Sequence, residues 1–109
     1  MTYKITDHKI TEEDRQLGTD FLGECWLGNI NLATANRTFT TDQDRTDLFR
    51  KLVELGKWWD FYYYVLPVYA NTEKQFGGVK IQDFVVWLFI DSPARACWLV
   101  IKFWKEDKK

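Results

Sequence analysis

The chain has 109 residues, of which 46% are hydrophobic and 17% aromatic, and its 15 basic and 16 acidic side chains leave a net charge of −1. This length suits a single domain, residues 1–109, whose core needs no disulfide or metal to hold it together. The hydrophobic content excludes a disordered tail as the main state. The balanced charge gives no overall attraction to nucleic acid or to an anionic membrane, so neither is an expected partner.

The first half of the chain predicts two short strands and two helices. Polar and apolar residues alternate in 2–6, and glycine and asparagine interrupt the apolar residues of 24–35, so both segments are predicted to be strands. One helix is predicted after Thr11, whose side chain can cap free backbone amides. The other is predicted between a Thr41 cap and a Gly56 stop, because the apolar residues between them fall on one helical face.

The second half predicts the sheet. Residues 58–66 are aromatic and β-branched, which favours a strand, and the alternative is a helix that runs on to Pro67. Residues 79–90 and 96–104 have the same character, and the proline in 91–95 fits a turn between them, so they are predicted to be the arms of a central β-hairpin. We therefore expect an α+β fold, with an antiparallel sheet of four to five strands and two helices packed on one face.

The chain shows no signal for export or for a membrane span. Its longest wholly apolar run, 84–90, is far shorter than the ~20 residues that cross a bilayer. Residues 1–5 lack the apolar core of a signal peptide. We therefore expect a cytoplasmic protein, in which Cys25 and Cys97 are buried free thiols.

No residue pattern predicts a metal, a cofactor or a catalytic site. His8 is the only histidine and Ser92 the only serine, so neither a zinc site nor a serine nucleophile beside a base is indicated. Asp60 and Asp83 each interrupt an aromatic run and are the carboxylates on which a small enzyme would depend. The simpler interpretation is that both point outward from a strand and keep it soluble. We therefore expect a non-enzymatic protein.

The aromatic residues are the strongest functional signal. Six Trp, five Tyr and eight Phe are more rings than a core of this size usually needs, and surface Trp and Tyr are common anchors of interfaces. The residues predicted to bind a partner are Trp58, Trp59, Tyr62, Tyr64, Trp87, Trp98 and Trp104. Alternatively, a nucleotide could stack between such rings, with Lys80 or Arg95 on its phosphate.

In size and composition this short, single-domain chain, without catalytic motifs and with many aromatic and acidic side chains, resembles the small phage-encoded anti-defence proteins, including anti-CRISPR inhibitors. The resemblance implies a non-enzymatic protein that inhibits a bacterial defence effector by occupying its working surface. The alternative, from a different class, is a small-molecule binder or sponge for a nucleotide signal, which would favour a symmetric oligomer such as a homodimer.

Overall fold

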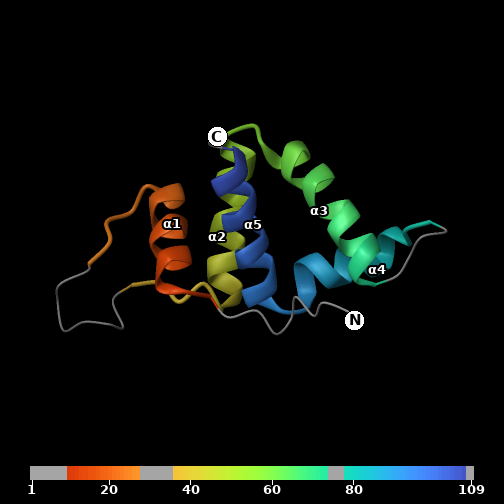
Figure 1. The fold of residues 1–109 in the computed structure, drawn as a ribbon, viewed down its shortest axis with the longest axis horizontal. Helices are drawn as coiled ribbons and strands as arrows, with labels where there is room; N and C mark the ends of the chain where they lie inside the picture. The colour runs from red at the N-terminus through yellow and green to blue at the C-terminus, as the bar shows by residue number, and fades with distance from the viewer. Residues whose placement is uncertain (1–9, 28–35, 74–77, 108–109) are drawn as a thin grey trace.

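The computed structural model describes residues 10–27, 36–73 and 78–107, and every regular element in these ranges is helical (Figure 1). In chain order the elements are α1 (Glu12–Leu22), α2 (Asp42–Glu54), α3 (Trp58–Thr72), α4 (Ile81–Val85), the π-helical turn η3 (Val86–Ile90) and α5 (Pro93–Asp107). The predicted α+β fold with an antiparallel sheet is therefore wrong for the described part of the chain. Of the two predicted N-terminal strands, 2–6 lies outside the described residues, and residues 24–27 of the other form no strand.

Both predicted helices of the first half are confirmed, and their caps explain where they begin and end. The Thr11 hydroxyl accepts from the Asp14 amide at 3.1 Å, and the Asp14 carboxylate accepts from the Thr11 amide at 3.0 Å, which forms a capping box. At the start of α2, the Thr41 hydroxyl accepts from the Asp44 amide at 3.1 Å. Gly56 follows the end of α2 with a φ of 70°, a conformation that glycine adopts without strain.

The predicted strand at 58–66 is instead the first part of α3. Phe61, Val65 and Tyr69 recur every fourth residue, and all three are buried, so a helical face and not an alternating one contacts the core. Pro67 lies inside the helix and is exposed, so it costs one backbone hydrogen bond without ending α3.

The predicted β-hairpin is also wrong, because its two arms are helices. The first arm forms α4 and η3, and its buried side chains Phe84, Trp87 and Leu88 share one helical face. The chain breaks at 91–92, and α5 begins at Pro93, a favoured first helical residue. The α4–η3 segment and α5 meet at 94°. The turn predicted at 91–95 is therefore correct only at 91–92, because residues 93–95 belong to α5, and the break joins two helices.

The helices α1, α2 and α5 pack on one another, α3 contacts α2 and α5, and η3 contacts α5. Figure 1 shows α1, α2 and α5 side by side, with α3 leading away from them toward α4. Contacts between aromatic rings connect these helices in the core. The ring centres of Phe61 and Phe103 are 5.7 Å apart, and those of Tyr69 and Trp87 are 5.0 Å apart. Much of the aromatic content is therefore used to fill space between helices.

Candidate functional site

The solvent-facing side of α4 and η3 is mostly apolar, since its exposed residues other than Gln82 and Asp83 are all apolar. The opposite side of the same helix fills the core through Phe84, Trp87 and Leu88. The segment is thus apolar on nearly all sides but covered on only one, which is unusual for a helix of a globular domain. Its exposed apolar side chains, which we call the α4–η3 apolar face, are Ile81, Val85, Val86, Phe89 and Ile90, with exposures from 40% to 66%.

Other helices show what an ordinary solvent face looks like in this protein. The exposed residues of α1 are all polar, namely Glu12, Glu13, Gln16 and Asp20. The exposed residues of α5 are likewise polar, namely Lys102, Lys105, Glu106 and Asp107. Among the described residues, the large apolar side chains that are exposed outside α3 and α4–η3 are Val53 and Leu55, at the end of α2. The apolar exposure is therefore concentrated on α4–η3, and such patches mark interaction surfaces.

A second exposed group lies on α3. Trp59 and Tyr63 are one helical turn apart, and each is more than half exposed. The Trp59 ring contacts the Tyr62 ring at 5.4 Å, and Tyr62 contacts Phe84 of α4 at 5.4 Å. A chain of ring contacts therefore links the α3 aromatic pair, Trp59 and Tyr63, to the segment that carries the α4–η3 apolar face.

The seven aromatic residues predicted to bind a partner have different environments. Trp59 is exposed, Trp87 is only 4% exposed, and the rest are half-buried against the core, namely Trp58, Tyr62, Tyr64, Trp98 and Trp104. The Trp104 ring, for example, lies 4.9 Å from that of Phe21. Sequence reasoning missed the aliphatic residues of the α4–η3 apolar face. The available signal was the apolar run 84–90, which, read as a helix, cannot bury all its sides at once.

Beside this face lies a hollow of about 360 Å³, which we call the Trp87–Arg95 hollow. It is lined by residues from the end of α3, from α4 and η3, and from the corner before α5, namely Tyr69, Glu73, Asp83, Val86, Trp87, Asp91 and Arg95. Val86 belongs to both the hollow and the α4–η3 apolar face, so the two are continuous. The indole N–H of Trp87 is buried and has no hydrogen-bond partner among the described residues, an arrangement that costs stability.

Arg95 is the buried charged residue in the lining of this hollow. Its guanidinium donates from Nη2 to the Trp87 carbonyl oxygen at 2.6 Å and lies 4.2 Å from the centre of the Trp87 ring. Burial lowers the pKa of Arg95, and the nearby carboxylates of Asp91 and Glu73 oppose that shift. The geometry lies at a π-helical turn, an element often found at functional sites.

The structure thus brings together two residues of the predicted nucleotide site, Trp87 and Arg95. Lys80 is exposed at the N-terminal cap of α4 and is not one of the residues that line the hollow. Asp60 and Asp83 were predicted to lie on strands, and this is wrong. Both are exposed in the first turns of helices, α3 and α4, where a carboxylate stabilises the helix dipole.

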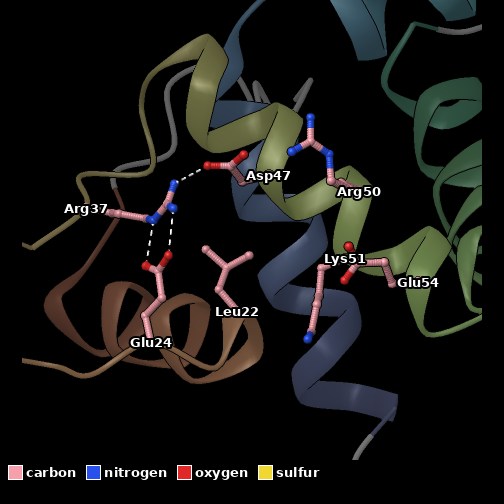
Figure 2. Close-up of a pocket in the computed structure, with 7 residues that line it drawn as sticks. All are labelled: Leu22, Glu24, Arg37, Asp47, Arg50, Lys51 and Glu54. Atoms are coloured by element: carbon pink, nitrogen blue, oxygen red, sulfur yellow. Dashed lines mark hydrogen bonds and ion pairs between the residues drawn. The ribbon is translucent and has the colours of Figure 1, made fainter.

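A second hollow, of about 250 Å³, lies between the α1 end and α2 (Figure 2). Arg37 donates from Nε and Nη2 to the two carboxylate oxygens of Glu24, both at 2.7 Å, and from Nη1 to Asp47 at 2.7 Å and Asp44 at 3.1 Å. The Glu24 hydrogen bonds are the largest cause of a raised Arg37 pKa, and Arg37 lowers the pKa of Asp47. Every guanidinium nitrogen of Arg37 already binds a carboxylate. We therefore interpret this cluster as a structural network of ion pairs that holds residues 36–37 to the helices.

The cysteines differ from each other. Cys97 is buried, as expected, and burial raises its pKa to about 12. Cys25 is exposed, so the prediction that it is buried is wrong, because it follows the Gly23 cap at the open end of α1. In the ranges that the structure describes, no group of three or more His, Cys, Asp or Glu residues could hold a metal ion.

No single helix in the described part of the chain has the length and apolar composition of a membrane span; one bent pair, α4–η3 with α5, meets that test jointly. Comparison with family models, curated proteins and solved structures found no match for this chain.

Proposed function

We propose that this chain is a non-enzymatic protein-binding domain, which acts by occupying the surface of a partner with the exposed apolar side chains of α4–η3 and α3. The observation that carries the proposal is the α4–η3 apolar face, five exposed apolar side chains on one ten-residue helical segment. Leaving such a patch in water has a cost that a partner would remove, since each Å² of buried apolar surface contributes roughly 25 cal/mol.

Following the resemblance in size and composition, we propose a bacterial defence effector as the class of partner, encountered in the cytoplasm. The domain would inhibit it by steric occupation. Trp59 and Tyr63 are suited to contribute to the interface, because exposed aromatic rings are over-represented among residues that dominate binding energy.

The test is affinity capture from a bacterial lysate that contains diverse defence systems, with three tagged forms of the protein. Ile90→Lys places a charge on the most exposed residue of the α4–η3 apolar face. Gln16→Lys adds the same charge to the polar face of α1 and is the matched control. We expect the wild type and Gln16→Lys to retain the same protein in stoichiometric amount through high-salt washing, and Ile90→Lys to lose it. Equal retention by all three forms would refute the proposal.

A nucleotide binder is the second candidate, favoured by the placement of Trp87 and Arg95 in one hollow. Three carboxylates, on Glu73, Asp83 and Asp91, line the same hollow and would repel a phosphate. Mass spectrometry of the supernatant from acid-denatured, purified protein tests this candidate. A nucleotide at one equivalent per chain or per dimer would favour it over the protein-binding domain.

A further inference from the structure

We propose that the α4–η3 apolar face binds an amphipathic helix of the partner whose flanking residues are basic, and that one lysine or arginine of that helix enters the Trp87–Arg95 hollow. This inference rests on the proposed function, since it assumes that the face binds protein. It goes further by naming the chemistry of the segment that covers the face.

The charge of the hollow indicates a cation. Glu73, Asp83 and Asp91 are exposed around it, whereas Arg95 is the one basic residue in its lining. The Arg95 guanidinium is already engaged, because it donates to the Trp87 carbonyl oxygen and lies 3.8 Å from an Asp91 carboxylate oxygen. The net negative charge that remains favours a basic group and disfavours an acidic one.

A second buried cation near this corner does not change the balance. Arg45 donates to the Asp91 carbonyl oxygen at 2.8 Å and pairs with the Asp42 carboxylate at 2.5 Å. Arg45 therefore reaches the hollow only at the backbone of Asp91, and its charge is paired with Asp42, which does not line the hollow.

The walls of the hollow suit a basic side chain. Tyr69 and Trp87 line it with aromatic rings, and an ammonium or guanidinium group is attracted to such rings. Lysine and arginine also carry long aliphatic stems that pack against apolar residues such as Val86.

The dimensions favour a helix as the binding segment. The α4–η3 apolar face spans ten residues, 81–90, which at about 1.5 Å per residue is roughly 15 Å, or two to three helical turns. An amphipathic helix laid on this face would bury apolar residues at spacings of three and four, in the helix-in-groove mode. Since Val86 joins the face to the hollow, a basic residue next to the apolar stripe would reach the carboxylates.

The experiment measures binding of two labelled synthetic peptides by fluorescence anisotropy. One is an amphipathic helix of leucine and lysine, and the other has glutamate at each lysine position. We expect the lysine peptide to bind the wild type at least tenfold more tightly than the glutamate peptide. Ile90→Lys should weaken binding of the lysine peptide at least tenfold, because it places a like charge on the face.

Paired carboxylate variants locate the charge effect. Glu73→Gln combined with Asp83→Asn removes two carboxylates of the hollow and leaves Asp91 with Arg95. Glu12→Gln combined with Glu13→Gln removes two exposed carboxylates from the first turn of α1 and is the matched control. We expect the first pair of substitutions to weaken binding of the lysine peptide about 3- to 10-fold, the effect of losing two exposed ion pairs. The control substitutions should change the affinity of that peptide less than twofold.

The proposal is overturned by equal affinity for both peptides, by equal weakening from the two carboxylate pairs, by flotation with phosphatidylcholine vesicles that Ile90→Lys abolishes, or by a wild-type dimer that Ile90→Lys dissociates. The last two would assign the face to a lipid surface or to a second copy of this chain.

Failure of this inference is distinguishable from failure of the proposed function. If Ile90→Lys loses the captured cellular partner but the Glu73 and Asp83 pair does not, the binding face stands and the basic helix is rejected.

Discussion

The Arg95 guanidinium both stacks on the Trp87 ring, at 4.2 Å from its centre, and donates to the Trp87 carbonyl oxygen at 2.6 Å. This contact lies at the π-helical turn, whose closing bond runs from the Asp91 amide to the Val86 carbonyl oxygen, five residues back. Arg45 of α2 holds the same corner through the Asp91 carbonyl oxygen. Two buried arginines thus fix the angle between η3 and α5, on which the shape of the candidate site depends.

Arg95→Ala is expected to destabilise the protein by about 2–4 kcal/mol, since it removes a charge-assisted hydrogen bond and a desolvated cation–π contact. Arg95→Lys keeps the charge but not the planar stacking group. It should therefore retain less than half of the free energy of unfolding that Arg95→Ala loses. Denaturant unfolding followed by circular dichroism gives both free energies. A change below about 0.5 kcal/mol for Arg95→Ala would show that this contact does not hold the corner.

The elements predicted correctly from sequence are those with strong end signals. The Thr11 and Thr41 caps and the Gly23 and Gly56 stops fix α1 and α2 locally, and local signals need no knowledge of the rest of the fold. The missed elements are the apolar ones. In 58–66 and 84–90 apolar residues occupy almost every position, so the periods of strand and helix cannot be distinguished, and β propensity misleads.

The candidate site was predicted only in part for a related reason. Composition indicated that aromatic residues reach the surface, and Trp59 does. Which of the other rings are exposed depends on helix packing, and Trp104 and Tyr64 are half-buried because they pack against Phe21 and Phe103. The approach of Arg95 to Trp87 takes place at the π-helical turn, for which the sequence carries no distinctive signal.

Gly18→Ala is expected to destabilise the protein by about 1–3 kcal/mol, although alanine usually stabilises a helix relative to glycine. A Cβ atom at this position would lie 2.7 Å from Cζ of Phe39, which is fully buried, so the ring has no room to yield. Denaturant unfolding of Gly18→Ala, Phe39→Leu and the double variant measures the coupling. If Gly18→Ala costs as much in the Phe39→Leu background as in the wild type, the steric explanation fails.

Arg37→Ala is expected to lower the free energy of unfolding by about 1–3 kcal/mol near neutral pH, because three carboxylates lose a shared partner. Arg37 lowers the pKa of Asp47 below its ordinary value of 3.8 in the folded protein, so this contribution is present above that pH and is lost as the pH falls through the folded pKa. Unfolding measured from about pH 6 to pH 2 should therefore show a steeper loss for the wild type than for Arg37→Ala.

Arg50→Ala is the control for this acid dependence. Arg50 is exposed and lines the same hollow (Figure 2), but the hydrogen bond from Arg37 is the largest cause of the Asp47 pKa shift. We expect Arg50→Ala to change stability by less than about 0.5 kcal/mol and to keep the acid profile of the wild type. Identical acid profiles for the wild type and Arg37→Ala would contradict the assignment.

The two cysteines are expected to react with a chromogenic disulfide reagent at very different rates. Cys25 is exposed and should react at once in the native protein, whereas Cys97 is fully buried and should react only when the protein unfolds.

The Cys97 pKa rises from 9.0 to about 12 on folding, so the unfolded chain binds fewer protons between these values and stability falls as the pH rises through this window. The slope due to this one thiol is at most about 1.4 kcal/mol per pH unit. Cys97→Ala should show a flatter alkaline decline than the wild type, and Cys25→Ala should not, so equal declines in all three proteins would show that Cys97 ionises no less easily in the folded state.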